Sequence, residues 1–297
     1  TGNHTVFIVS DGKRNYSWKP FSKHHSNVYK ITRNLYKNTI GNKIMFEEVN
    51  QDLNLTFRYT WKTRDKYGFI KASELVNHSK RTLSIKLLDG IRNILPYGVD
   101  TLSQATRSTL VDGYKRCELS ADYGMGIFTL SSIISDKAEP SEALKATTVW
   151  SKGLEQPTYL LSEQQVSAFE KNKRIDTEFD VKGRRGAFYI SSTVVLGEGT
   201  SKEWVIVSEL NQTAVKIESL MKEIESGDAI LEDLENDVLK GDENLKKLVF
   251  EADGFQMTRN ANTIYRHFSN TLYNIMRGGI YAAGYNIETS DLKQFIN

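Results

Sequence analysis

FEEVNQDLNLTFRYTWKTRDKYGFIKASELVNHSKRTLSIKLLDGIRNILP, residues 46–96, carries the clearest structural signal in the chain. Between Leu53 and Trp61 the apolar and aromatic residues occupy every second position, and polar residues fill the positions between them. A period of two places the two sets on opposite faces of a β-strand. The stretch therefore predicts a strand with one buried face.

Two further runs follow this strand, at 67–76 and 83–87, and each is separated from the one before it by a short polar turn. Three strands joined in this way predict an antiparallel meander. A sheet that is packed on one side needs a second layer. Its exposed face is predicted to carry three cations, Arg58, Lys71 and Lys86.

The rest of the chain divides near residue 211. Before it we expect short strands and loops over 1–50, one short helix within 102–119, a loop at 135–148, a short helix at 162–169, and strands at 124–134, 175–181, 187–196 and 204–210. After it the apolar residues follow helical spacing. The predicted helices are 213–225, a segment from Asp228 to Val238, a third that starts at Gly241, and 260–276.

Composition limits the classes of function. The chain has 297 residues, 39% hydrophobic and 26% charged, as a folded protein does. The formal net charge is only +2, so bulk charge does not favour nucleic acid as a partner. No apolar run reaches the ~20 residues that cross a bilayer, so no membrane span is expected. Localisation stays open between the cytoplasm and the periplasm or exterior after removal of a signal.

The sequence carries none of the common cofactor or metal motifs. Glycine-rich phosphate loops in a strand-to-helix setting, GxSxG, HExxH and CxxC are all missing. His24 and His25 are adjacent, which on a strand would point them to opposite faces and prevent joint metal binding. Cys117 is the single cysteine and is expected to be a small buried hydrophobe. We therefore expect no cofactor and no metal.

Two kinds of residue point to carbohydrate chemistry. Glycoside hydrolysis needs two carboxylates roughly 5 to 9.5 Å apart, and the candidates are Glu47 with Glu48, Asp89, Glu139 with Glu142, and Glu178 with Asp180. Sugar binding needs aromatic faces for the ring and hydrogen-bonding groups for the hydroxyls. Residues of these types are mixed at Arg58, Tyr59, Trp61, Arg92, Asn93 and Tyr97. The alternative for the aromatics is that they fill the space between two sheets.

The segments FRYTWKTRDKYGFIKASELVN (57–77) and LLDGIRNILPYG (87–98) carry a family resemblance. The chain resembles the N-terminal β-supersandwich of large galactose-mutarotase-like, carbohydrate-active enzymes, and glycoside phosphorylases of the cellobiose phosphorylase type are the nearest comparison. The resemblance implies a mainly β fold: a two-layer antiparallel β-supersandwich at 1–210 and a smaller α-helical linker at 211–297. It also implies a catalytic (α/α)6 domain beyond Asn297, so no catalytic residue is assigned within this chain.

The resulting hypothesis is a non-catalytic scaffold from a bacterial glycoside hydrolase or glycoside phosphorylase, with an oligosaccharide or polysaccharide as partner. Its predicted sugar-facing residues are Trp61, Arg92, Asn93, Arg107, Arg184 and Arg185. The adjacent arginines of the last pair suit a phosphate or carboxylate.

Two alternatives remain open on the sequence. One is a self-contained carbohydrate enzyme of mutarotase or lyase type, with Glu47, Asp89 and His267 as acid and base. The other is a protein-interaction module that uses the helices of 213–276, for example to form a homodimer. The amphipathic helices support some partner, because their apolar stripes must be buried.

Overall fold

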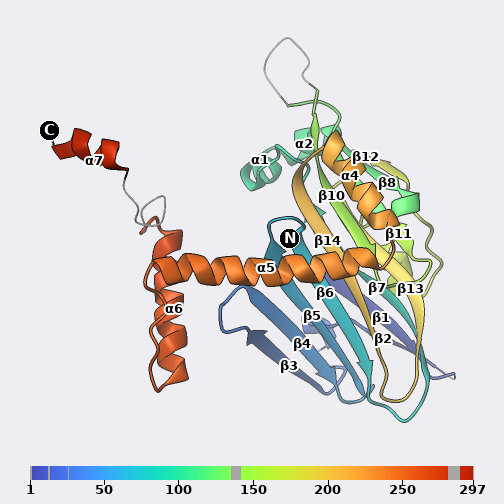
Figure 1. The fold of residues 1–297 in the computed structure, drawn as a ribbon. Coiled ribbons are helices and arrows are strands. Elements are labelled where there is room, and N and C mark those ends of the chain that lie inside the picture. The colour runs from blue at the N-terminus through green and yellow to red at the C-terminus, as the bar shows by residue number, and fades with distance from the viewer. Residues whose placement is uncertain (1, 13, 26, 135–141, 280–287, 297) are drawn as a thin grey trace.

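A computed structural model describes residues 2–12, 14–25, 27–134, 142–279 and 288–296, and shows two antiparallel β-sheets stacked face to face (Figure 1). Within these residues the smaller sheet has five strands in the order β11-β13-β7-β1-β2. The larger sheet has nine, in the order β12-β8-β9-β10-β14-β6-β5-β4-β3. The two-layer antiparallel sandwich predicted from the sequence is confirmed.

The strands of the smaller sheet are β1 (Gly2–Ser10), β2 (Asn15–Trp18), β7 (Leu83–Ile94), β11 (Thr158–Leu160) and β13 (Gly186–Leu196). Those of the larger sheet are β3 (Ile31–Lys37), β4 (Lys43–Asn50), β5 (Leu55–Arg64), β6 (Gly68–Asn77), β8 (Lys115–Ser120), β9 (Met125–Leu130), β10 (Lys145–Lys152), β12 (Asp180–Lys182) and β14 (Ser201–Thr213). The α-helices are α1 (Thr101–Thr106), α2 (Ser108–Tyr114), α3 (Val166–Glu170), α4 (Ala214–Glu225), α5 (Ala229–Glu251), α6 (Ala261–Met276) and α7 (Thr289–Ile296). Two 3-10 turns, η1 (Lys23–His25) and η2 (Ala121–Tyr123), complete the set of described elements.

The main core lies between the two sheets. The inward residues of β5, Leu55, Phe57 and Tyr59, are buried there, as the alternation predicts. Phe57 stacks on Trp204 of β14 and makes an edge contact with Phe7 of β1 in the opposite sheet. Each buried side chain of this size contributes about 1.5–3 kcal/mol relative to full exposure. These aromatics therefore fill the space between the sheets.

The predicted three-strand meander is wrong in its third strand. β5 and β6 form the expected hairpin, but β7 pairs with β1 and β13 in the smaller sheet, and the second edge of β6 pairs with β14. β7 is buried on both faces: Leu87 faces the inter-sheet core, whereas Leu88 faces a second cluster beneath α3. A central strand that is covered on both faces carries apolar residues on both. Its sequence therefore lacks the strict apolar–polar alternation of a half-buried strand.

Lys71 was predicted to be exposed and is instead completely buried. It lies on the inner face of β6, where its ammonium group binds Asp89 of β7 across the sandwich. Arg58 does lie on the outer face of its strand, as predicted, and binds Glu47 and Glu74.

The helices α4 and α5 cover part of the outer face of the larger sheet. Ile224, Ile230, Leu234 and Val238 on the helices pack with Ile70, Trp150 and Val207 of the sheet and with Tyr67 of the β5–β6 turn. Figure 1 shows α5 crossing the strands and continuing, with α6, beyond the edge of the sheet.

The predicted break at Gly241 is wrong, because α5 is continuous. A Cβ at Gly241 would lie 2.8 Å from Arg64 Cδ, so glycine here leaves room for Arg64 of β5. Arg64 Nη2 then binds Asp242 Oδ1 at 2.9 Å, and Lys43 Nζ binds Asp242 Oδ2 at 2.5 Å. The glycine serves helix-to-sheet packing, which offsets the roughly 1 kcal/mol of helix propensity that it loses.

Other local predictions also differ from the structure, and the strand predicted at 175–181 is β12 only from Asp180. The single helix predicted within 102–119 is two short helices followed by β8. β10 begins at Lys145, inside a predicted loop whose residues 135–141 lie outside the described part of the chain. The segment 31–50, predicted as short strands and loops, forms the long pair β3–β4. β8 and β10 each pair with a strand that is distant in the sequence, β12 and β14 respectively, and local propensity does not reveal such pairing.

Candidate binding pocket at the end of the sandwich

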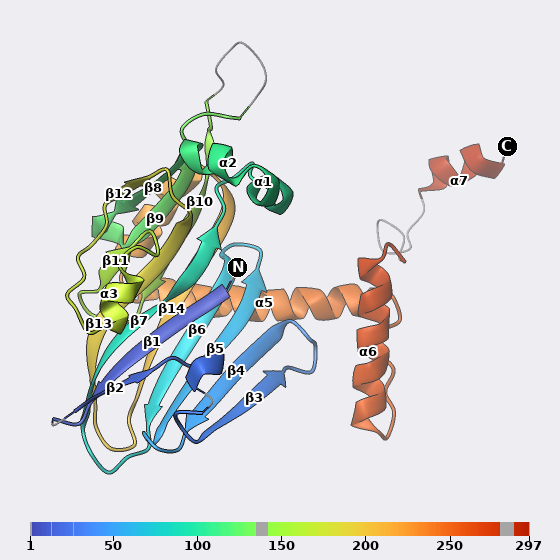
Figure 2. The same cartoon turned by 180° about the vertical axis from the view of Figure 1, so that it is seen from behind.

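A pocket of about 360 Å³ lies where the chain leaves β7 and forms α1 and α2. Figure 2 shows these two helices at one end of the sandwich, beside the start of β10. The apolar part of the lining comes from the β7–α1 connection, α2, β9 and the segments that flank residues 135–141: Val99, Leu110, Val111, Leu130, Ile133, Ile134, Ala143 and Leu144. Its volume and mostly apolar lining are typical of a small-molecule site.

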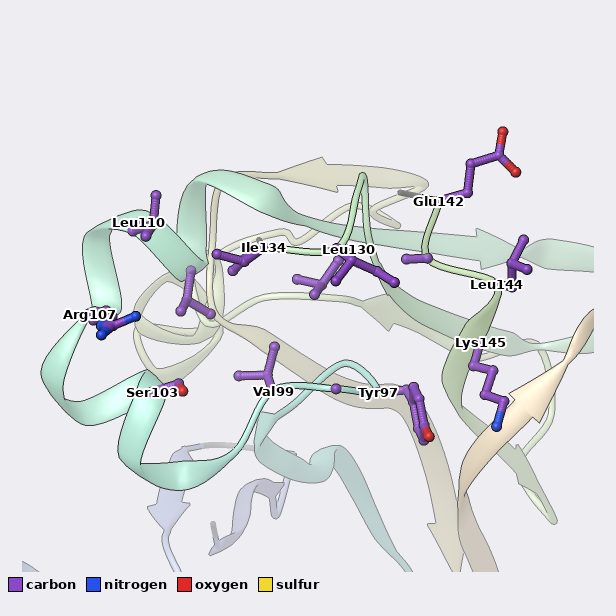
Figure 3. Close-up of a pocket in the computed structure, with 14 residues that line it drawn as sticks. Tyr97, Val99, Ser103, Arg107, Leu110, Leu130, Ile134, Glu142, Leu144 and Lys145 are labelled. Atoms are coloured by element: carbon purple, nitrogen blue, oxygen red, sulfur yellow. The ribbon is translucent and has the colours of Figure 1, made fainter. Parts of the chain in front are cut away.

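Polar groups border this apolar lining. Tyr97 and Lys145 lie together on one side of the pocket and Arg107 on the other (Figure 3). Lys145 Nζ is 4.8 Å from the centroid of the Tyr97 ring, a cation–π distance. Tyr97 remains 43% exposed, so part of the ring is accessible. Ser103 and Glu142 add a hydroxyl and a carboxylate to the lining.

Local sequence explains how the polar groups are placed. Pro96 accepts the backbone N–H of Val99 in a turn, with Gly98 at φ +85°, which directs the chain away from β7. Asp100 then caps α1, because its carboxylate accepts the N–H of Ser103. Backbone and side-chain hydrogen bonds from Ser103 lower the pKa of Asp100, so the cap is charged at neutral pH. Arg107 follows α1 and its N–H binds Ser103 O at 2.9 Å.

A buried lysine fixes α1 and α2 to the sheet. Lys115 at the start of β8 donates to Asp112 Oδ1 at 2.8 Å and also to Gln104. Burial alone would raise the pKa of Asp112, but hydrogen bonds from Lys115 and Gln104 outweigh it and hold that pKa below its usual range. Arg185 Nε lies 3.8 Å from Asp112 Oδ2. One end of the pocket is thus anchored by ionic contacts.

The structure brings some of the predicted sugar-facing residues near this end. Arg107 lines the pocket. Arg92 and Asn93 are at the end of β7, and β13 begins beside them, since Gly186 pairs with Ile94 and Ala187 with Arg92. Arg184 and Arg185 directly precede that strand, in the turn after β12.

Three members of the predicted set, Arg92, Asn93 and Trp61, are not part of the pocket lining. Arg92 Nε lies 3.3 Å from Glu163 Oε1, and Asn93 is exposed at φ +55°. Trp61 is on β5 of the larger sheet and packs against the inter-sheet core. It does not line the pocket. The roles of all six residues in binding stay predictions.

The candidate carboxylates take part in structural hydrogen bonds. Glu48, fully buried, accepts from Trp18 Nε1 at 2.8 Å, Phe21 N at 2.6 Å and Arg33 Nε at 2.7 Å. Glu47 accepts from Arg58, Asn34 and Tyr36.

The later carboxylates are held similarly. Glu178 accepts the N–H groups of Leu161 and Ser162 at 2.8 and 2.9 Å. Asp180 binds Lys182 and Arg116. Glu142 lines the pocket, and Glu139 lies outside the described residues.

The three residues of the self-contained-enzyme alternative are not brought together. Asp89 is completely buried between the sheets, whereas Glu47 lies on the outer face of the larger sheet. His267 is on α6, where Nε2 lies 2.8 Å from the backbone oxygen of Asp253.

Cys117 is buried in the inter-sheet core, and burial raises the pKa of its thiol to about 12, which makes it a poor nucleophile. Within the described ranges no group of three or more His, Cys, Asp or Glu side chains is arranged to hold a metal ion. No helix of the described chain is long and apolar enough to cross a membrane.

Comparison with known proteins gives structural similarities only. No family model and no curated protein matches the chain. Among solved structures it is similar to a putative kojibiose phosphorylase from the human microbiome, with a TM-score of 0.49 and 10% identity over 90% of this chain and 31% of that one. It is also similar to a bacterial glucoamylase complexed with acarbose, with a TM-score of 0.41 and 10% identity over 93% of this chain and 33% of that one.

A galactose mutarotase-like protein from Clostridium acetobutylicum aligns with a TM-score of 0.29 and 9% identity, over 71% of this chain and 80% of that one. Phosphorylase and galactose mutarotase-like proteins, the two classes in the sequence resemblance, are thus both among the similar structures. The chain spans about a third of the phosphorylase and glucoamylase chains.

Proposed function

We propose that this chain is the non-catalytic sandwich domain of a glycoside hydrolase or phosphorylase. We also propose that the pocket beside α1 and α2, called the end pocket from here on, contacts carbohydrate. The observation that carries the proposal is the pocket itself, which combines an accessible Tyr97 ring, the guanidinium of Arg107 and an apolar lining in one hollow of about 360 Å³. A non-catalytic role is favoured because the carboxylates Glu47, Glu48 and Glu178 hold neighbouring side chains or backbone groups.

The chemistry of the pocket suits a sugar ring. The C–H faces of a pyranose pack on an aromatic ring, while the hydroxyls need both donors and acceptors. Tyr97 supplies the ring, Arg107 and Lys145 supply donors, and Ser103 and Glu142 supply acceptors. Lys145 also holds the Tyr97 ring in place through the cation–π contact.

Isothermal titration of the chain with oligosaccharides, with and without phosphate, tests this proposal. We expect saturable binding that Tyr97→Ala and Arg107→Ala each weaken by about tenfold, as loss of one stacking or charged hydrogen-bonding partner does. Tyr36→Ala is the matched control, because Tyr36 is an exposed tyrosine on β3, far from the pocket lining. Absence of heat with every ligand, or equal loss in all three variants, would exclude the pocket as a carbohydrate site.

A specific observation also favours an interaction role for the helices. On their solvent-facing sides α5 and α6 expose Leu239, Phe250 and Tyr273, each at least 59% accessible. In the proposed scaffold this surface receives a further domain of the same polypeptide. If it instead joins two copies of this chain, light scattering will give the mass of a dimer, and Phe250→Ser will return it to a monomer.

A further inference from the structure

A second pocket, separate from the one described above, lies where β14 passes into α4. Its volume is about 300 Å³, and it is enclosed by the β5–β6 turn, the end of β14 and the first turns of α4. Most of the residues that line it have polar or charged side chains: Asp65, Lys66, Tyr67, Trp150, Glu209, Gln212, Lys216, Ser219, Leu220 and Glu223. The size is at the lower end of the range for ligand sites.

The backbone is irregular at this point. The register between β10 and β14 shifts between Ala146 and Thr148, where Gln212 and Glu209 are the partners. Asn211 in the bulge adopts φ +60°, a left-handed conformation that costs free energy outside glycine. Bulges re-aim side chains and are frequent beside functional sites. The bulge sets the direction of Glu209 relative to α4.

Glu209 is the unusual side chain in this pocket. Oε1 accepts the backbone N–H of Leu210 at 3.1 Å, but Oε2 is buried with no hydrogen-bond partner. The carboxylate lies over Gly68, where a Cβ would be only 2.0 Å from Oε2. Burial raises the pKa of Glu209. A buried acceptor without a partner is destabilising, so it needs an explanation.

Glu223, on α4, has two partners on one of its carboxylate oxygens. Its Oε2 accepts Tyr67 Oη at 3.0 Å and Lys66 Nζ at 3.0 Å. Lys66 also lies over the Tyr67 ring. One carboxylate is therefore held by a cation and a phenol, while the other keeps an oxygen unused.

We propose that this pocket binds a small neutral ligand bearing hydroxyl groups, and that a hydroxyl pairs with the carboxyl group of Glu209. The terminal torsion of Glu is broad, so rotation about Cγ–Cδ presents an oxygen to the pocket. A hydroxyl donates to the ionised carboxylate and accepts from the protonated acid, so it satisfies Glu209 in either state.

The surrounding charges select the ligand class. Lys66 and Lys216 line the same pocket and disfavour a cation. Asp65 and Glu223 disfavour an anion. Trp150 is only 1% exposed, so the site lacks an aromatic platform and does not repeat the chemistry of the end pocket. A neutral polyol of at most one ring remains.

Amide NMR of the chain titrated with D-glucose, glycerol and ethylammonium tests the inference. We expect saturable shifts at Gly68, Ser219 and Leu220 with the two polyols. Glu209→Ala should weaken glucose binding about tenfold, whereas Glu209→Gln, which keeps one acceptor and adds a donor, should change it less than threefold. Glu203→Gln is the matched control, because Glu203 is on the same face of β14 but outside this pocket.

The outcomes separate this site from the end pocket. Tyr97→Ala should leave the glucose shifts at Gly68 and Ser219 unchanged, even if it abolishes oligosaccharide binding. The inference is overturned if the polyols cause no saturable shift at these amides, if only ethylammonium does so, or if Glu209→Ala binds glucose as the native chain does.

Discussion

Lys71 Nζ lies 2.5 Å from Asp89 Oδ1, and neither side chain has any exposed surface. The pair joins β6 of the larger sheet to β7 of the smaller one through the middle of the sandwich. Asp89 also accepts Thr5 Oγ1 at 2.6 Å, Trp204 Nε1 at 2.7 Å and Ser73 Oγ at 3.2 Å. Every acceptor position of this carboxylate is thus used, as a buried charge requires.

Removing one partner of this pair should be strongly destabilising. Asp89→Asn and Lys71→Met are each expected to lower the free energy of unfolding by roughly 3–5 kcal/mol, because each leaves an uncompensated buried charge or donor. The double variant should lose less than the sum of the two. Urea denaturation of the four proteins measures this coupling, and simple additivity would show that the ions do not depend on each other.

Docking of α5 on the sheet should depend on its buried stripe. Leu234 is 4% exposed beneath α5, and Leu234→Ala is expected to cost about 2–5 kcal/mol through the cavity that it leaves. Leu239→Ala, on the exposed side of the same helix, should change stability by less than about 0.5 kcal/mol. Denaturant unfolding with hydrogen exchange along α5 would check both, and an equal effect of the two variants would contradict the packing.

Glu48 is expected to hold the loop after β2 in place. Glu48→Gln replaces a charged acceptor of three hydrogen bonds by an amide, which should cost roughly 1–3 kcal/mol. The indole N–H resonance of Trp18 should move with it. Glu118→Gln, an exposed carboxylate paired with Arg116, is the control and should be near neutral. An unmoved Trp18 resonance would argue against the assigned contact.

The raised pKa of Glu209 predicts a pH-dependent stability difference. Burial disfavours the ionised form, so the folded-state pKa lies above the unfolded value of 4.5. As the pH rises through and above 4.5, the unfolded chain releases this proton more readily, and the native protein loses stability. Glu209→Gln should therefore be more stable than the native chain at pH 7, with no advantage below pH 4.5. Unfolding measured from pH 3.5 to 8 checks this, and a difference independent of pH would refute it.

Sequence patterns predicted the elements whose signals are local. The alternation around Phe57 gave the inner face of β5, and the helices expected at 213–225 and 260–276 are α4 and α6 within one residue at each end. Caps such as Thr213, whose side chain accepts Lys216 N, mark such boundaries in the sequence.

The elements that were mispredicted depend on distant partners. β7 enters the smaller sheet because β1 and β13 lie on either side of it, far away in the sequence. The local pattern predicts Lys71 as a surface cation, and only its contact with Asp89 of the opposite sheet explains its burial. Gly241 signals a helix end locally, but it serves the packing of Arg64. Tertiary contacts overrule local propensity in each case.

The end pocket was visible only in part from the sequence. Tyr97 belongs to the mixed polar and aromatic set that suggested sugar binding, and Arg107 belongs to the predicted sugar-facing residues. Lys145 and Glu142 join them only because β10 returns along β9 to the same end. No sequence pattern pointed to Glu209, because the β-bulge and the buried oxygen without a hydrogen-bond partner exist only in the folded structure.

The position of β3 has a consequence for how the protein behaves in concentrated solution. Among the described strands β3 ends the larger sheet, so one side of its backbone is free to recruit a strand from another molecule. Lys37 on this strand places positive charge along that margin, beside the exposed Leu35 and Tyr36, whereas the charge of Arg33 is paired with Glu48. Mutual repulsion between copies of Lys37 opposes stacking of like molecules and fades as salt shortens its range. Colloidal behaviour is therefore tied to a side chain that contributes little to the interior.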